Sequence, residues 1–320
     1  MNRRSALRLG LAALGLGAVG AGAAGLTGRA AGEHRGPARS LVIAAGEPGG
    51  FYVEFASLLA ARLDADLGAS VWPTDGSRSN LELVHDRRAD LGLVLADSAA
   101  TAAGGGPPFP APLPLRAIGR VYENYMQLVV AEEDPALAVA DLAGRRISLG
   151  APGSGAALFG DRLLAASGVT AVVDHRSLTE AAADLAAGRL DALLWSGGVP
   201  TPALVALAAA RPIRLLDLTG ALAALRSAHG PVYQRVVVPP GTYGHHAAVA
   251  TIGVANFLLT SPALPDDVAA AVARVLVRAA PDLIPPSAAG TQYLDLRSLI
   301  TTAPVPLHPG AAAAYRDLHG

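Results

Sequence analysis

Short apolar runs alternate with amphipathic segments along the chain from residue 41 onward. The runs at 41–44 and 69–72 have the length and composition of buried strands, and residues 55–63 between them place large apolar side chains on one helical face. A turn at 74–80 then caps the next helix. The expected elements are strands at 41–44, 69–72 and 90–95 and helices at 55–63 and 80–88. This β-α-β-α-β order predicts an α/β fold, with a parallel sheet covered by helices.

The same order of elements returns in the middle of the chain. The expected parts are strands at 147–149, 170–173 and 190–195, helices at 156–166 and 178–187, and a glycine turn at 150–155. Each of the two spans ends in an aspartate, Asp90 or Asp191, next to an apolar strand. We therefore predict two lobes of like topology, each with a glycine turn at the carboxyl edge of its sheet. Ligands of open α/β sheets bind at that edge, so two facing lobes would form a cleft.

The segments between and after these spans set the expected domain boundaries. A strand at 125–131 leaves the first lobe, and a strand at 247–260 with a helix at 265–280 returns to it. Residues 104–114 are expected as a surface loop, 141–146 as a short helix and turn, and 302–320 as a segment across the outside. The predicted organisation is an export signal at 1–31, a linker at 32–40, lobe 1 at 41–124 plus 247–320, and lobe 2 at 125–246.

Residues 1–31 have the composition of an export signal. Arg3 and Arg4 form a basic pair, and residues 9–26 form an uncharged stretch rich in Ala, Gly and Leu. The pair favours a twin-arginine signal that is cleaved after export, which would place the protein outside the cytoplasm. The alternative is an uncleaved anchor, because about 18 apolar residues approach the length that spans a bilayer. Cleavage removes four arginines and no acid, and changes the net charge from −1 to about −5.

The composition excludes several classes of function. None of the 320 residues is cysteine, which excludes disulfides, thiol catalysis and zinc–thiolate sites. All 25 residues counted as Lys+Arg are arginine, so a Schiff-base lysine and the lysine of a phosphate-binding loop are excluded too. A net charge of −1 gives no support for a nucleic-acid partner.

The first glycine turn is a candidate anion-binding site. It follows a strand and precedes a helix, so the backbone N–H groups of Gly49, Gly50, Phe51 and Tyr52 are expected to converge at a helix N-terminus. Glycine permits close approach of a ligand to the main chain, and a helix N-terminus favours an anion. The alternative is a tight turn that binds nothing.

The second glycine turn strengthens the anion hypothesis and also raises another. Ser154 and Gly155 would cap a helix and donate to the same ligand. A dinucleotide site is the alternative, with Asp174 as the ribose-binding acid, although the glycine order is G-x-x-G-x-G rather than G-x-G-x-x-G. A serine hydrolase is disfavoured, because Pro152 and Ala156 occupy the positions of the outer glycines of the G-x-S-x-G motif.

Further polar and aromatic residues extend the candidate site. In the 74–80 turn, Ser77 and Asn80 could face the cleft, with Arg78 available for a carboxylate, or the serines could merely cap the helix. Trp195 could form an apolar cleft wall or belong to the core, Tyr122 and Tyr125 could belong to either, and Asp97 could be a helix cap or a cleft residue. The pair His245–His246 has no third ligand at metal-binding spacing, so no metal site is expected.

In this order and spacing, several motifs resemble the TAXI solute-binding proteins, the extracytoplasmic receptors of one branch of the tripartite ATP-independent periplasmic (TRAP) transporters. The resemblance covers nearly everything after residue 40. Its marks are the glycine turn before Tyr52, the Asp75–Asn80 turn, the Asp141–Gly155 stretch, Gly188–Ala192, Gly197–Pro202, Pro239–Tyr243 and Pro306–Ala311.

The resemblance implies a type II periplasmic-binding-protein fold, with two lobes, a hinge and a ligand cleft. It implies a non-enzymatic, monomeric receptor without a cofactor, which captures a small organic anion such as glutamate or a dicarboxylate and delivers it to a membrane permease. The positions carried over as binding residues are the Gly49–Tyr52 turn, Ser77, Asn80, Ser154 and the turn of Gly198, Val199 and Pro200.

The chain departs from the family pattern at three positions near the expected cleft. Phe51-Tyr52-Val53 stands where the family has Thr-Tyr-Tyr, Ala96 where it has Gln, and Ala156 where it has Thr. Each departure removes a polar group, so the ligand is expected to be less polar than glutamate, or the chain serves a membrane signalling partner instead of a permease. An exported dinucleotide-binding enzyme is the remaining alternative.

Overall fold

A computed structural model describes residues 40–63, 67–244, 247–285 and 294–319. The expected export signal and the pair His245–His246 lie outside these residues. Among the residues described, no helix combines the length and apolar character needed to cross a bilayer.

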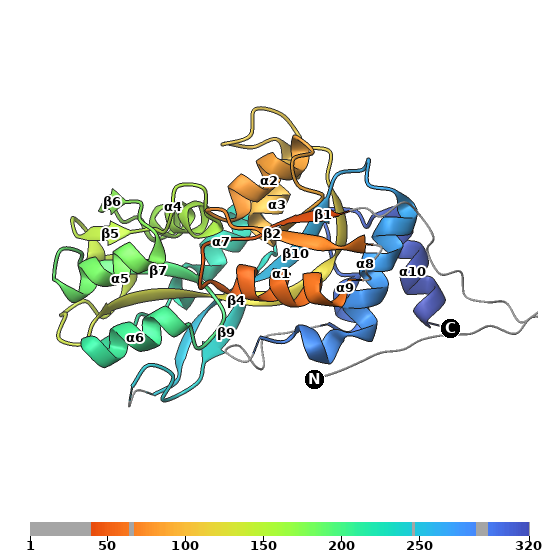
Figure 1. Cartoon of the computed structure of the whole chain (residues 1–320). Coiled ribbons are helices and arrows are strands. Elements are labelled where there is room, and N and C mark those ends of the chain that lie inside the picture. Colours follow the sequence, from red (N-terminus) through yellow and green to blue (C-terminus); the bar gives the residue numbers. More distant parts are fainter. Residues whose placement is uncertain (1–39, 64–66, 245–246, 286–293, 320) are drawn as a thin grey trace, which may run out of the picture. The chain divides into compact units, whose positions relative to one another are not determined.

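The described strands form one ten-stranded sheet with the order β2-β1-β3-β10-β4-β7-β5-β6, with β8 paired to β4 and β9 paired to β10 (Figure 1). The strands are β1 (Leu41–Ala44), β2 (Ala69–Trp72), β3 (Leu91–Leu95), β4 (Arg116–Ala131), β5 (Arg146–Ser148), β6 (Val172–Asp174), β7 (Ala192–Gly197), β8 (Ile213–Leu215), β9 (Tyr233–Val238) and β10 (Val249–Thr260). The helices are α1 (Phe51–Arg62), α2 (Ser77–His85), α3 (Ala96–Gly104), α4 (Gly155–Ser167), α5 (Leu178–Ala186), α6 (Pro202–Ala210), α7 (Leu222–His229), α8 (Asp266–Arg278), α9 (Leu296–Leu299) and α10 (Pro309–His319). Short 3₁₀ helices cover Val139–Leu142, Thr219–Ala221 and Ala280–Leu283. The predicted α/β fold is confirmed.

The internal repeat seen in the sequence is a repeat of strand topology. The parallel strands β2-β1-β3 form one end of the sheet, and the parallel strands β6-β5-β7 form the other. In each set an aspartate just before the third strand accepts a hydrogen bond from the backbone of the first strand. Asp90 accepts from the Val42 N–H at 3.0 Å, and Asp191 accepts from the Arg146 N–H at 2.8 Å. The repeated aspartate is therefore a strand-pairing device in both halves.

Two long antiparallel strands join the halves. From Arg116 to Tyr125, β4 pairs with β10, and from Tyr125 onward it pairs with β7. Strand β10 likewise pairs with β3 near its carboxyl end and with β9 near its start. This change of partner falls at Tyr125, where the sequence predicts the boundary between lobes; the lobe limits themselves stay a prediction.

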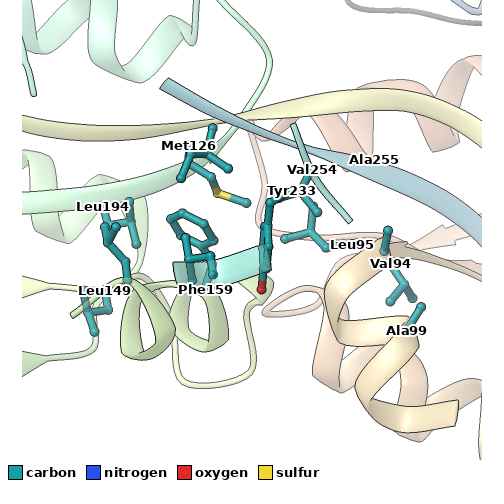
Figure 2. Packing of buried hydrophobic residues seen from close by; sticks show 14 of the residues in the cluster. Val94, Leu95, Ala99, Met126, Leu149, Phe159, Leu194, Tyr233, Val254 and Ala255 are labelled. Atoms are coloured by element: carbon teal, nitrogen blue, oxygen red, sulfur yellow. The ribbon is translucent and has the colours of Figure 1, made fainter. Parts of the chain in front are cut away.

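Helices cover both faces of the sheet because alternate strand residues point to opposite faces. Leu93 packs with α1, α8 and α10, whereas Val94 packs with α2 and α3. A second group of helices, α5 and α6, packs on β7 around Trp195. Figure 2 shows one apolar cluster that extends from the first half to the second, with Tyr233 beside Phe159 at a ring-centroid distance of 5.8 Å.

Several expected element boundaries were wrong in length rather than in type. Helices α1 and α2 begin at Phe51 and Ser77, earlier than expected, so their first turns lie inside the candidate turns. Strand β4 begins at Arg116 rather than at 125. The elements α3, α6, α7, β8 and β9 had no counterpart among the expected elements. The closing helix α10 packs on α8 and β4, where Tyr315 donates to the Ile118 carbonyl at 2.9 Å.

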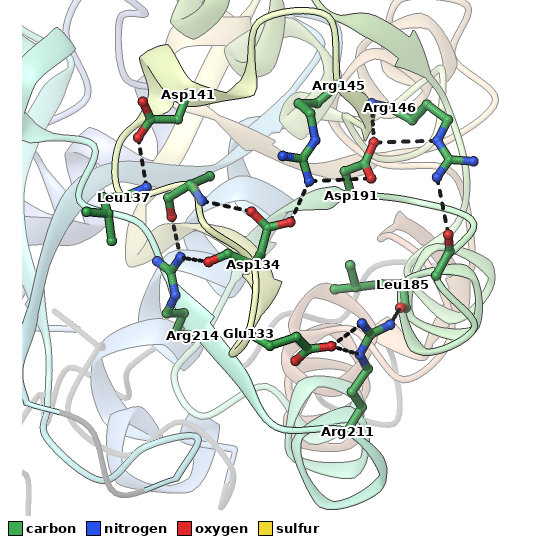
Figure 3. A network of polar contacts seen from close by, with 12 residues as sticks. Glu133, Asp134, Leu137, Asp141, Arg145, Arg146, Leu185, Asp191, Arg211 and Arg214 are labelled. Carbon is green, nitrogen blue, oxygen red and sulfur yellow. Dashed lines mark hydrogen bonds and ion pairs between the residues drawn. The ribbon is translucent and has the colours of Figure 1, made fainter.

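Asp141 and Arg145, which precede β5 in the Asp141–Gly155 motif, make polar contacts within the second half of the chain. Asp141 accepts hydrogen bonds from the Leu137 and Ala138 N–H groups, at 2.8 and 2.9 Å. Arg145 lies between Asp134, at 2.5 Å, and Asp191, at 3.5 Å (Figure 3). These arginine and aspartate residues are thus committed to contacts within the second half.

Candidate functional site

A small pocket lies at the carboxyl ends of strands from both halves of the sheet. Its volume is about 40 Å³. A cavity of about 10–15 Å³ holds one water molecule, so this pocket has room for roughly three water molecules. It is lined by Gly46, Glu47, Gly50, Phe51, Tyr52, Asp75, Gly76, Ser77, Leu95, Asn124, Ser154, Gly155, Ala156, Trp195 and Ser196.

The first wall contains the start of α1 and of α2. Gly50 is the N-cap of α1 and supplies no side chain to it, so the first N–H groups of that helix have no side-chain cap. Ser77 Oγ accepts a hydrogen bond from the Leu95 N–H at 3.0 Å and lies 3.4 Å from the Tyr52 hydroxyl. The Tyr52 hydroxyl in turn donates to Asn256 Oδ1 at 2.5 Å, and burial raises the pKa of Tyr52 well above its usual range. Tyr52 is therefore a neutral, fixed part of this wall.

The second wall is the start of α4. Ser154 is its N-cap and accepts a hydrogen bond from the Ala157 N–H at 3.1 Å. Gly155 and Ala156 occupy the first two helical positions, whose N–H groups have no partner within the helix. Gly155 packs tightly against the first wall, because a Cβ there would overlap Leu95 Cδ1 and lie 2.7 Å from Ser77 Oγ. The second wall thus presents backbone donors directly against the first.

The two walls also bond to each other. The Gly153 carbonyl accepts from the N–H groups of Arg78, at 3.0 Å, and Ser79, at 3.4 Å, so the start of α2 is capped by the opposite turn. On the other side of the pocket, Glu47 Oε2 accepts from the Leu178 N–H at the start of α5, at 2.9 Å.

The charged side chains that line the pocket are acidic. Glu47 and Asp75 contribute carboxylates, and among the described residues of the lining none is Arg, Lys or His. Burial raises the pKa of the Glu47 carboxyl, the Leu178 N–H opposes that rise, and the carboxylates of Asp75 and Glu180 add to it. Positive electrostatic potential in the pocket therefore comes from helix N-termini rather than from side chains.

Three buried polar atoms in the pocket walls have no hydrogen-bond partner among the described residues. They are Glu47 Oε1, Asn124 Oδ1 and Trp195 Nε1. Asn124 Nδ2 donates to Ser196 Oγ at 3.0 Å, which fixes the carboxamide at the end of the pocket nearest β7. Glu47 Oε1 and Asn124 Oδ1 are thus acceptors without a donor among the described residues, whereas Trp195 Nε1 lies against Gly197, which is not part of the lining.

Seven of the residues expected to bind ligand come together in this pocket: Gly50, Phe51, Tyr52, Ser77, Ser154, Gly155 and Trp195. Gly49, Gly198 and Pro200 line a neighbouring cavity of about 10 Å³, which Phe51 and Trp195 separate from the first. Val199 is buried and lines neither cavity.

Asn80 and Arg78 lie outside the pocket because their side chains are committed elsewhere. The Asn80 amide donates to the carbonyls of Ala45 and, at 2.7 Å, of Leu93, so it ties the ends of β1 and β3 together behind the first wall. The Arg78 guanidinium bonds Glu82 one turn along its own helix, at 3.0 Å, and is about half exposed.

Asp97 belongs to a buried network on another side of the molecule. Its carboxylate accepts from the Tyr233 hydroxyl at 3.1 Å and lies 3.7 Å from the Arg162 guanidinium. Arg162 also donates to Thr101 Oγ1 at 2.7 Å, so α4 is tied to α3. Burial raises the pKa of Asp97, and Arg162 opposes that rise. Asp97 lines a separate open cavity and connects the two halves of the sheet there.

The sequence interpretation did not single out Glu47, Asp75, Asn124 or Ser196 as site residues. The signal for Glu47 was present, since a carboxylate inside a glycine turn is unlike the small residues around it. Asn124 gave no such signal, because its position depends on where β4 changes its partner. Among the residues with described structure, no group of three His, Asp or Glu side chains is placed to hold a metal ion.

Comparison with known proteins places this geometry in context. Residues 43–318 match the sequence profile of the NMT1-like family. A solved structure from Bordetella bronchiseptica RB50 aligns with 88% of this chain and 98% of that chain at 16% identity, with a TM-score of 0.54.

Two sulfonate-binding proteins are also similar. The alkanesulfonate-binding protein SsuA from Xanthomonas axonopodis pv. citri, bound to MOPS, is 20% identical over 88% of this chain and 84% of that chain, with a TM-score of 0.48. The periplasmic aliphatic sulphonate binding protein SsuA from Escherichia coli is 17% identical over 88% and 79% of the respective chains, with a TM-score of 0.45. At these identities and TM-scores, neither similarity indicates what this chain binds.

Proposed function

The chain belongs to the NMT1-like family, and from its fold and its pocket we propose that it is an extracytoplasmic solute-binding receptor rather than an enzyme. The observation that carries the proposal is the pocket itself. Two halves of like topology place helix N-termini at the carboxyl ends of their strands, and these N-termini face one small space. An N-terminus of this kind binds a carboxylate or another anionic group without any basic side chain.

The finer proposal is a receptor of the TAXI type that serves a TRAP transporter. The TAXI-like motifs support it, because the glycine turn before Tyr52 and the Gly150–Gly155 turn form opposite walls of the pocket. The receptor would be exported through residues 1–31, act as a monomer, bind a small organic acid and hand it to membrane permease subunits.

Closure around the solute would bury its acidic group between the two walls. Ser154 and the first N–H groups of α4 would bind that group from one side, and the start of α1 from the other. No acid, base and nucleophile need to be combined for this task. The contacts between Gly153 and the start of α2 would then re-form over the bound solute.

A thermal-shift screen of small organic acids against the purified chain tests the proposal. A ligand that binds the folded state raises the melting temperature by mass action. We expect a carboxylate-bearing compound to stabilise the chain at millimolar concentration, with isothermal titration calorimetry confirming one site. The absence of any stabilising organic acid, or the co-purification of a nicotinamide or flavin, would overturn the receptor proposal.

A further inference from the structure

The charges around the pocket do not suit a ligand that is purely anionic. Glu47 and Asp75 bring two carboxylates to the lining, and no described lining residue is basic. The helix N-termini that face the pocket offset only part of this, since each is equivalent to about half a positive charge. A dicarboxylate would add two further negative charges to the same space, and like charges in a partly desolvated site repel strongly.

The Glu47 carboxylate is held in a way that leaves one oxygen for a ligand. Oε2 accepts from the Leu178 N–H at 2.9 Å, and this bond fixes the plane of the group. Oε1 is buried and has no partner among the described residues. A buried acceptor without a donor costs free energy, and a charged one costs more. A donor on the ligand would remove that cost.

The polar atoms of the lining comprise hydrogen-bond donors on one side and acceptors on the other. The first N–H groups of α4 are donors, and they suit a carboxylate. Glu47 Oε1 and Asn124 Oδ1 are acceptors, and they suit N–H groups. One small ligand that satisfies both surfaces must carry an acidic group and a protonated nitrogen close together.

We propose that the receptor selects a small solute that carries a protonated amine beside its carboxylate, with a net charge of zero or above, and that Glu47 is the residue that selects it. This inference rests on the proposed receptor function and narrows its ligand class. It disfavours dicarboxylates and acidic amino acids relative to neutral zwitterions.

The first test compares matched compounds on the purified chain. Each set compares an amino acid with the compound that lacks its amine and, in two sets, with the compound that lacks its carboxyl group: alanine with propionate and ethylamine, serine with 3-hydroxypropionate and ethanolamine, and glutamate with glutarate. We expect calorimetry to show a zwitterion bound at least tenfold more tightly than its deaminated acid. Equal or tighter binding by the deaminated acids would overturn this inference while leaving the receptor function standing. If none of these compounds binds, the inference fails, whereas the receptor function fails only if the wider thermal-shift screen of organic acids also finds no ligand.

The second test changes Glu47 and a control acid. Glu47→Gln keeps the shape of the side chain and an oxygen for the Leu178 N–H, but removes the charge. Glu82→Gln removes a carboxylate from α2 that is paired with Arg78 away from the pocket. We expect Glu47→Gln to weaken binding of the zwitterion at least tenfold and to leave the affinity for its deaminated acid unchanged. Glu82→Gln should change neither affinity. An equal loss for both compounds would mean that Glu47 only holds the walls together, and would overturn the assignment.

A third variant keeps the test decisive if Glu47→Gln does not fold, which circular dichroism would reveal. Asp75 is exposed at the rim of the same pocket, so Asp75→Asn removes the second carboxylate with little risk to folding. We expect the zwitterion to lose affinity by a few-fold relative to its deaminated acid. An unchanged ratio between the two compounds would contradict the proposed charge selection.

Discussion

The two glycine turns that face each other across the pocket have the same place in the topology but different chemistry. The turn before α1 ends in Gly50, has no side-chain cap and carries the Glu47 carboxylate. The turn before α4 ends in Ser154, whose hydroxyl caps the helix, and no charged residue of it lines the pocket. The repeated topology thus supplies backbone donors on both sides, and single residues decide the charge that each wall presents.

The two walls pack closely at Gly155. Gly155→Val would drive a side chain into Leu95 and Ser77, which costs about 1–3 kcal/mol as overpacking and forces the walls apart. We expect loss of measurable ligand binding by calorimetry and a lowered melting temperature. Gly104→Val is the control, because a Cβ at the end of α3 meets nothing within 4 Å. Normal binding by Gly155→Val would show that the walls do not close as described.

The first wall relies on Ser77 to satisfy a buried backbone donor. Ser77→Ala leaves the Leu95 N–H without its acceptor, and this should lower the free energy of unfolding by about 1–3 kcal/mol. Urea denaturation measures the change. Ser57→Ala, on the exposed side of α1, should stay within about 0.5 kcal/mol of the wild type. If the two variants had the same free energy of unfolding, the hydrogen bond to Leu95 would make no net contribution to stability.

The second wall relies on a helix cap. Ser154→Ala should cost about 1 kcal/mol of stability, as should Ser177→Ala, which removes the cap of α5 outside the pocket. Only Ser154→Ala should also weaken binding of the organic acid, by a few-fold, because the Ser154 hydroxyl lines the pocket. Parallel titrations of the two variants separate capping from binding. Equal affinities in both would remove Ser154 from the site.

The smallest effect that we expect is a pH dependence caused by Glu47. Burial raises the pKa of its carboxyl above the ordinary value, so acidification protonates it while an exposed glutamate stays ionised. An amine-bearing ligand needs the ionised form, so its affinity should fall as the pH drops through the raised pKa of Glu47. Calorimetry at several pH values checks this. The Glu47→Gln variant should show no such fall with the same ligand, and a fall there would implicate another group.

The repeated strand topology followed from the sequence because buried apolar runs determined it. The runs at β1 and β3 are continuous and end in turns, so their positions were clear. Helix α3 was not recognised, because its Ala, Ser and Gly residues show no apolar stripe. The first half of β4 was also not recognised, since Arg120 and Glu123 interrupt its apolar pattern; in the structure they form an ion pair at 2.6 Å.

The glycine turns of the site followed from the sequence, whereas the roles of the polar side chains did not. Backbone donors at a strand-to-helix turn are set by local geometry, so both turns reached the pocket. Side chains such as Asn80 and Asp97 look alike in sequence whether they face a ligand or bond to distant main chain. Asn80 bonds to β1 and β3, and Asp97 to Arg162 on α4, through contacts that only the tertiary fold creates.

The change of partner in β4 has a consequence for how the molecule flexes. At Tyr125 and Gly253 both crossing strands are hydrogen-bonded, and neither passes through a loop. Gly253 fits there because a Cβ would overlap Glu123 Oε1 and approach Val236 Cγ1 at 2.7 Å. A bend at this joint has to be absorbed as strand twist over several residues. Amide hydrogens of β4 and β10 should therefore resist deuterium exchange, because a bend at this position deforms paired strands and opens no loop.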